Sequence, residues 1–526
     1  MTNKKELQFS EGLGFLSEIK VEESIEKPEY GKVDVEKGWK TTTVNNKPED
    51  PNLVTWDNAA DPMNPKNWPM KDKWIVTLII SLFLLATLMS STIISPALPD
   101  IAKSLDITSD VEIQTTISAF VLGYAFGPLF LAPLSEMYGR VIVVQWSNVW
   151  FVIWSIVSGF AATKTQLITA RLMAGIGGSA ALTIGGGIVG DVWKPEQRGR
   201  SLALYNLIPL LGPAFGPLMG GYIAQRASWR WSFFTLAIFE TVLIILSFAT
   251  FKETYGPTVL KRKAKALRKA TGNFNLYTKH KKENPALLPK LKTTLSRPTK
   301  LLFTHPIIQI LAIYGAYSFG LLYIVHTTFP KLWTERYHES VSQSGLNFIS
   351  IAIGFTIGAQ VAGPITDRIW QHLRKKAAIS NPTLNGLEPV IIPEYRVPLM
   401  VPGALLVPVG LLIYGWCAQS HTHWIGPNIG IAIFSAGTTV GTHCQTAYVI
   451  DAYPDHTASA LAAIAVMKDF AGFGFPLFAP QMYKALDYGW GNTLIAGVAI
   501  LLGVPMPWVL WNYGARIRAK SGAIRV

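Results

Sequence analysis

The sequence has little charge and little cysteine. Only 15% of its 526 residues are charged, whereas 49% are hydrophobic, a balance that argues against a soluble multidomain enzyme and indicates a chain embedded in a lipid bilayer. Two cysteines, Cys417 and Cys444, each lie inside an apolar run, so we expect neither a disulfide framework nor a metal site. The N-terminal stretch lacks a basic segment followed by a short apolar one, so we expect no cleavable signal peptide.

The net charge of +14 comes from basic residues that lie between apolar runs. Segment 252–300 carries 14 Lys/Arg against two acids, Glu253 and Glu283. Positive connections face the cytoplasm in membrane proteins, so this segment and both termini are expected to be cytoplasmic. We therefore expect the basic residues to reflect membrane topology and not binding to nucleic acid. Segment 252–300 is expected to be a solvated linker, and the alternative is that it binds anionic lipid.

Twelve runs are apolar and long enough to cross a bilayer as helices. The first half of the chain supplies 74–96, 112–132, 141–162, 166–191, 201–224 and 230–251, and the second half supplies 306–329, 345–365, 397–418, 424–448, 457–479 and 491–512. The predicted fold is all-α, with two six-helix halves at 74–251 and 306–512. They are flanked by a largely disordered tail (1–73), joined by a basic linker (252–305) and followed by a short tail (513–526).

A short motif recurs at the ends of the second and eighth predicted spans. Its first copy runs from Ala132 to Arg140 and its second begins at Gly363. The two share a small residue, proline, an aliphatic residue, a hydroxyl and an acid in the same order, which predicts a duplicated six-helix unit. The motif residues that we expect to latch the halves are Leu134, Glu136, Gly139, Arg140, Gly363, Asp367 and Arg368; the alternative is that these charges only set topology.

The motif resembles the loop between the second and third helices of the major facilitator superfamily, which follows Gly-x-Leu-Ala-Asp-Arg-x-Gly-Arg-Lys. This chain departs from it with Ala132, Glu136, Met137 and Val141. The fourth span adds Arg171 with Gly175 and Gly177, similar to the family's second motif. An arginine inside a span is costly and marks a functional site by default.

The fifth span matches the antiporter motif of drug and proton exchangers at every fixed position. The matching residues are Gly212, Gly216, Pro217, Gly220 and Gly221. Glycines four residues apart allow two helices to approach closely, and many membrane helices use this spacing for packing alone. Packing alone does not account for the complete motif, which also fixes Pro217 and Gly221. Further short motifs narrow the resemblance to the fungal twelve-span drug:proton antiporters; they lie at 67–69, 251–255, 393–398 and 475–480. It implies export of drugs, toxins or secondary metabolites from the plasma membrane in exchange for protons.

Proton exchange requires a titratable group in the pathway, and four charged residues inside predicted spans are the candidates for coupling. These are Arg171, Glu240, Lys468 and Asp469. Glu240 is either a proton carrier or a buried hydrogen-bonding residue, whereas the resemblance places Lys468 and Asp469 on a helix that lines the pathway. Polar and aromatic candidates for the cargo surface are Tyr124, Gln145, Asn206, Tyr314, Tyr317, His326, Gln360, His443 and Gln445. The alternative is that the histidines are hydrogen-bonded helix residues and that the others are interfacial anchors or packing residues.

Two other classes of function compete with an exporter. One is a proton-coupled importer of a polyamine, organic acid or nutrient on the same fold. The other is a membrane enzyme or receptor, against which we find no P-loop lysine motif, metal-ligand cluster or nucleophile elbow in the sequence. The expectation is a monomer that binds small-molecule cargo and protons, with no cofactor and no metal.

Overall fold

The structure is a computed structural model that describes residues 52–58, 60–278, 287–380, 392–453 and 457–520. Within these residues the chain is helical, apart from one isolated bridge between Leu53 and Tyr277. Helices are the expected solution where lipid cannot satisfy an exposed backbone.

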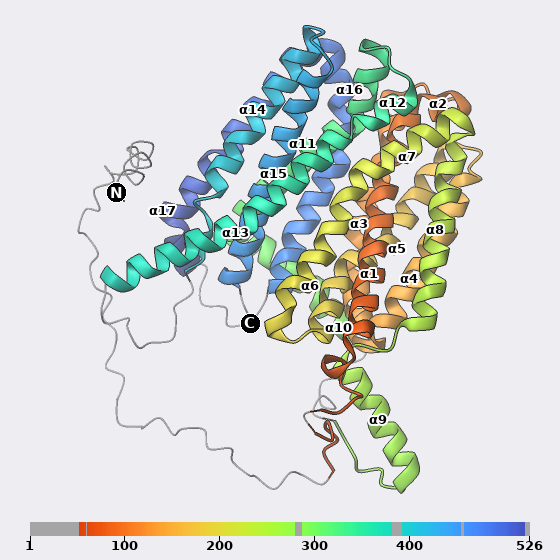
Figure 1. The fold of residues 1–526 in the computed structure, drawn as a ribbon, viewed down its shortest axis with the longest axis vertical. Coiled ribbons are helices and arrows are strands. Elements are labelled where there is room, and N and C mark those ends of the chain that lie inside the picture. The colour runs from red at the N-terminus through yellow and green to blue at the C-terminus, as the bar shows by residue number, and fades with distance from the viewer. Residues whose placement is uncertain (1–51, 59, 279–286, 381–391, 454–456, 521–526) are drawn as a thin grey trace, which may run out of the picture. The chain divides into compact units, whose positions relative to one another are not determined.

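The first eight helices form one group, which we call the N-terminal bundle (Figure 1). Its elements are α1 (Met70–Thr92), α2 (Leu98–Ser104), α3 (Asp110–Tyr138), α4 (Arg140–Gly159), α5 (Lys164–Val192), α6 (Pro195–Leu207), α7 (Gly212–Arg226) and α8 (Trp229–Thr250). Two short 3₁₀ turns interrupt its helices, at Ser95–Ala97 after α1 and at Ile208–Leu211 between α6 and α7. Each turn contains a proline, which cannot donate the backbone hydrogen bond of a continuous helix.

The last seven helices form a second group, the C-terminal bundle. Its elements are α11 (Pro306–Lys331), α12 (Val341–Leu346), α13 (Ile349–Ser380), α14 (Met400–Gln419), α15 (Ile425–Ala452), α16 (Thr457–Gly503) and α17 (Pro505–Lys520). Helix α16 is broken at Asp487, whose φ of 55° lies in the left-handed region. The bundles meet where α3 packs on α16 and where α7 packs on α12 and α13.

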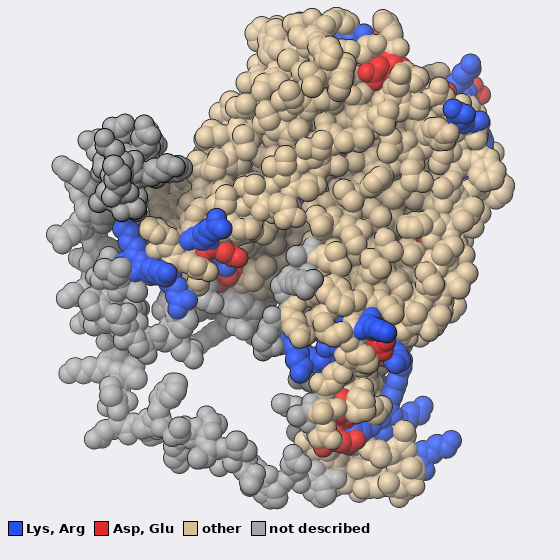
Figure 2. Space-filling model, viewed as in Figure 1, with Lys and Arg blue, Asp and Glu red and all other residues tan. Residues whose placement is uncertain are grey.

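Ten helical segments of the described chain are long and apolar enough to cross a membrane. Helix α15, which spans 28 residues, lies over predicted span 424–448 but is not among the ten. The segment Ser459–Ala519 is counted once although it covers two predicted spans. Figure 2 shows charged side chains gathered at the two ends of the spans, with almost none on the face between them.

The linker forms helices α9 (Gly256–Thr271) and α10 (Leu287–Thr304). We call the end of the spans at which they lie the linker end (Figure 1). Residues from the predicted N-terminal tail pack here, because Lys263 of α9 lies 2.7 Å from Asp57 and 3.3 Å from Asp61. Backbone N–H groups of Asp57 and Met63 donate to Asp61 and hold the pKa of its carboxyl below the usual value. Burial opposes charge on Lys263, but its hydrogen bonds to these aspartates raise its pKa overall. Both partners therefore stay charged at neutral pH.

Candidate functional site

At the end opposite the linker, three polar contacts between described residues join the two bundles. The Ser95 hydroxyl donates to the carbonyl of His326 at 2.6 Å, and the Ser342 N–H donates to Gln225 at 3.2 Å. An ion pair between Lys484 of α16 and Asp110 of α3 completes the set. Each contact joins a residue of the N-terminal bundle to a residue of the C-terminal bundle. The two bundles are therefore in contact at this end, which we call the closed end.

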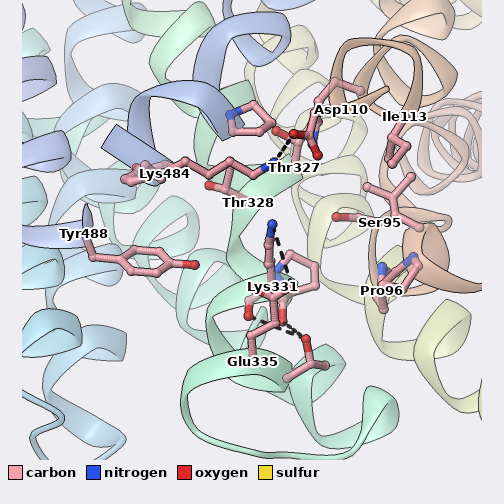
Figure 3. A pocket seen from close by; sticks show the side chains of 17 residues that line it. Ser95, Pro96, Asp110, Ile113, Thr327, Thr328, Lys331, Glu335, Lys484 and Tyr488 are labelled. Atoms are coloured by element: carbon pink, nitrogen blue, oxygen red, sulfur yellow. Dashed lines mark hydrogen bonds and ion pairs between the residues drawn. The ribbon is translucent and has the colours of Figure 1, made fainter. Parts of the chain in front are cut away.

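A pocket of about 290 Å³ lies between the bundles at this closed end. Figure 3 shows the Lys484–Asp110 pair on one side and Lys331 beside Glu335 on the other. Its walls come from both bundles: Ser95, Pro96, Leu98, Pro99, Asp110, Ile113, Gln114, Thr327, Thr328, Pro330, Lys331, Thr334, Glu335, Pro480, Tyr483, Lys484 and Tyr488. Opening this end would therefore pull the pocket apart.

At the linker end, the first motif copy is held within the N-terminal bundle. Gly139 has a φ of 110°, a conformation that favours glycine, and a Cβ there would lie 2.2 Å from a carboxylate oxygen of Glu253. The backbone N–H of Arg140 donates to Glu253 at 3.0 Å. The Arg140 guanidinium pairs with Asp191 at the end of α5 and lies 4.8 Å from the Tyr255 ring centroid.

The second motif copy is held in the same way within the C-terminal bundle. Arg396, which precedes α14, donates to Asp367 and to Asp451 at the end of α15, each at 2.7 Å. Arg518 of α17 donates to both oxygens of Glu394, at 2.6 and 2.7 Å. An arginine at the start of α4 (Arg140) thus meets an aspartate at the end of α5, and an arginine just before α14 (Arg396) meets an aspartate at the end of α15.

Arg171 is fully buried at the centre of the N-terminal bundle. Its Nη1 donates to the carbonyl and hydroxyl of Ser90 at 2.8 and 3.2 Å, and its Nε donates to the carbonyl of Thr116 at 3.3 Å. Its guanidinium also lies 4.6 Å from the centroid of the Phe120 ring. Ser90 is in the last turn of α1, where the final carbonyls of a helix lack intrahelical partners. Arg171 therefore caps the end of α1 from a different helix.

Asp469 and Lys468 lie on α16, where it faces the N-terminal bundle. The Lys468 ammonium is 3.7 Å from Asp469 and 4.5 Å from the centroid of the Phe319 ring. The side chain of Lys468 is 27% exposed, whereas that of Asp469 is 5% exposed. Tyr323 of α11 lies within electrostatic range of Asp469 and of Arg171, and its hydroxyl lies beside Ser91.

Buried polar groups from both bundles thus lie near enough for their charges to act on one another, and we call Arg171, Tyr323 and Asp469 the polar cluster. Tyr124 lies beside it, since this buried tyrosine is within electrostatic range of Tyr323 and Asp469. Three of the four predicted charged residues (Arg171, Lys468 and Asp469) lie in or beside the cluster. Glu240 is the exception: it is fully buried on α8, which packs on α4 within the N-terminal bundle, and neither of its carboxylate oxygens has a hydrogen-bond partner among the residues that the structure describes.

Comparison with known proteins identifies the family to which this chain belongs. Residues 80–476 match the model of the Major Facilitator Superfamily. The chain belongs to the major facilitator superfamily. A protein described as "Efflux pump vrtL" from Penicillium aethiopicum is 43% identical, covering 90% of this chain and 91% of its own length. A "Probable efflux pump mfs2" from Aspergillus flavus is 42% identical over 81% of this chain and 99% of its own.

Solved structures of the superfamily share the fold. The inward-open xylose transporter XylE from E. coli superposes with a TM-score of 0.60 at 15% sequence identity, covering 84% of this chain and 96% of its own. This similarity concerns the fold alone. The major facilitator chain described here is accordingly an all-helical, multi-pass membrane protein of a transporter family rather than of an enzyme family.

The remaining cargo candidates of this major facilitator protein separate into two groups. Gln145, Tyr314, Tyr317, His326 and Gln445 are buried. Two of these have structural partners: Gln145 donates to Ser247 at 3.4 Å, and Gln445 donates to the carbonyl of Leu311 at 2.6 Å. Asn206, Gln360 and His443 are exposed.

Several residues of the site were missed by sequence reasoning. Asp191 pairs with Arg140, and its position at the end of the fourth predicted span, matched by Asp451 at the end of the tenth, is a signal that the sequence offers. Ser90, Ser91 and Tyr323 gave no signal, because serine and tyrosine are common in membrane helices.

The antiporter string lies on α7, and its glycines allow contact on two sides. A Cβ on Gly216 would lie 2.7 Å from the carbonyl of Met89 in α1, and one on Gly220 would lie 1.8 Å from that of Ile93. A Cβ on Gly221 would lie 2.6 Å from the carbonyl of Val341 in the other bundle. The string therefore packs α7 against α1 and against α12.

We expect Gly216→Leu to lower the melting temperature of the detergent-solubilised protein and to abolish export. A leucine cannot fit against the backbone of α1 without separating the two helices. Gly186→Leu is the matched control, because no atom lies within 4 Å of a Cβ at Gly186. Equal melting temperatures and equal export for the two variants would contradict the packing role of the string.

Proposed function

We propose that this chain exports small organic molecules in exchange for protons, by alternating access of two six-helix halves. The polar cluster formed by Arg171, Tyr323 and Asp469 carries the proposal. It is buried, it contains an acid, and it draws groups from both bundles. A change in the protonation of Asp469 would therefore act where the halves meet.

The relatives and the antiporter string support the direction of transport. Relatives about 40% identical over most of the chain are described as efflux pumps. Drugs, toxins and secondary metabolites are the cargo that we propose, with the plasma membrane as the site of action. Uptake of a polyamine, organic acid or nutrient is the competing function.

The proposed architecture has twelve spans. It follows if α15 is added to the ten segments and if Ser459–Ala519 is divided at the break at Asp487. The matched arginine–aspartate pairs, Arg140 with Asp191 and Arg396 with Asp451, support a duplicated six-helix unit.

The proposed orientation places the linker end in the cytoplasm, with both termini, because basic connections favour that side. The closed end with its three joining contacts would then be external. The structure would represent an inward-facing state, in which each motif copy is bound within its own half. Opening to the outside requires the Lys484–Asp110 pair to break.

Purified protein in liposomes tests the coupling. With an acidic lumen and a neutral exterior, we expect fluorescent amphipathic compounds to accumulate in the lumen as protons leave it. An antiporter gives this result whichever way it is inserted, whereas a proton symporter accumulates cargo only when the exterior is acidic. A pH-sensitive dye in the lumen should report proton release on addition of cargo. Accumulation with the opposite gradient would indicate the uptake function instead.

A further inference from the structure

A second concave site lies on the outer surface of the N-terminal bundle, away from the polar cluster. It is a groove of about 440 Å³ between α3, α4 and α5. Its walls are Leu131, Leu134, Tyr138, Ile142, Val143, Trp146, Ser147, Trp150, Ile176 and Gly177. In a multi-pass membrane protein this groove is continuous with the lipid-facing surface, so its occupant comes from the bilayer.

The groove carries three aromatic side chains, Tyr138, Trp146 and Trp150, and contacts between α4 and α5 hold its walls together. The Trp150 indole N–H donates to the carbonyl of Met173 at 2.9 Å, which ties α4 to α5 and fixes the ring. Gly177 brings the two helices together, because a Cβ there would lie 2.7 Å from the carbonyl of Ser147. Trp146 is 62% exposed and Trp150 is 43% exposed, so both indoles offer apolar surface to lipid.

The polarity of the groove changes along its length. Its lining is almost entirely hydrophobic, and Tyr138, the last residue of α3, lines its linker end two positions before Arg140. The sequence here, Leu134-x-x-x-Tyr138-x-Arg140, fits a pattern proposed for sterol contact. This pattern occurs in many sequences by chance, but here two of its three fixed residues, Leu134 and Tyr138, line a groove.

We propose that this groove is a sterol-binding site. A sterol has a rigid, flat, apolar ring system and one hydroxyl at its end, which matches an apolar aromatic groove with one polar end. A phospholipid chain would lose rotational freedom on entering a fixed groove, whereas a fused ring has little to lose. The site adjoins the α3–α4 loop, so membrane sterol would stabilise the loop that holds the first motif copy.

A photoreactive sterol tests the proposal on the full chain in phosphatidylcholine nanodiscs. We expect crosslinks within α3 to α5, competed by excess ergosterol but not by additional phosphatidylcholine. Trp146→Ala should reduce crosslinking about fivefold, as expected for the loss of roughly 1 kcal/mol of aromatic contact. Trp490→Ala, which removes a 59% exposed tryptophan elsewhere, should leave it unchanged.

Ile142→Trp provides a second variant that fills the groove instead of emptying it. It should exclude the sterol while the protein still elutes as a single folded species in size-exclusion chromatography. Equal competition by phosphatidylcholine would show that the groove holds ordinary annular lipid, and the proposal would be wrong. Unchanged crosslinking in both groove variants would also overturn it.

Discussion

Asp469→Asn is expected to abolish pH-driven accumulation of cargo and to leave exchange of cargo across the membrane intact. Asparagine keeps the size of the side chain but cannot take up or release a proton. Asp469 lies 3.7 Å from Lys468 and within electrostatic range of Tyr323 on another helix, so its charge is felt across several helices. Without that change of charge, the halves can still alternate around cargo, but the pH gradient no longer biases them.

Glu240→Gln is the matched control, because it neutralises the other buried carboxyl near the middle of a span. Glu240 lies on α8, which packs on α4 within one bundle, and has no hydrogen-bond partner among the described residues. We expect accumulation close to that of the unmodified protein. Loss of gradient-driven transport in Glu240→Gln, with normal coupling in Asp469→Asn, would move the proton site to the N-terminal bundle.

The two measurements must be made on the same liposome preparations. Counterflow, in which labelled cargo enters liposomes preloaded with unlabelled cargo, reports alternating access without a pH gradient. A variant that fails both assays has lost binding or folding, whereas one that fails only the first has lost coupling. This separation distinguishes a proton carrier from a residue that supports the fold.

The sequence predicts the membrane class well, because that class depends on a local pattern. Long apolar runs require helices in lipid, and the glycines of the antiporter string require close neighbours, which the structure supplies. The break of α16 at Asp487 was also anticipated as a boundary between two predicted spans. The 3₁₀ turn at Ser95–Ala97 was not, since predicted span 74–96 ends inside it and treats Ser95 and Pro96 as the last residues of a continuous helix.

The polar cluster was only half predictable, for a physical reason. A charged residue inside a span is easily recognised among apolar neighbours, so the sequence alone indicates Arg171 and Asp469. Their partners are a tyrosine and backbone carbonyls from distant parts of the chain, and backbone carbonyls exist at every residue. Which of them lack an intrahelical partner depends on where a helix ends, and the end of α1 at Thr92 is visible only in the structure.

Arg171→Ala is expected to lower the melting temperature of the protein and to abolish both accumulation and counterflow. The alanine leaves the carbonyl of Ser90 without its donor in the bundle interior, at a cost of about 1–3 kcal/mol for an unpaired buried polar group. It also removes the positive charge that offsets the negative end of the α1 dipole. The end of α1 adjoins Ser95, which contacts the other bundle, so a loosened end disturbs the contact between the halves.

Arg171→Lys separates the capping role from a role in coupling. Lysine keeps the charge near the end of α1 but, with a single nitrogen, cannot reach both Ser90 and Thr116 as the guanidinium does. If Arg171 only caps the helix, accumulation and counterflow should fall in the same proportion. If its charge also acts on Asp469 through Tyr323, accumulation should fall further than counterflow. A melting temperature and export rate in Arg171→Ala equal to those of the unmodified protein would refute both roles, because a buried arginine with four donated hydrogen bonds would then contribute nothing measurable.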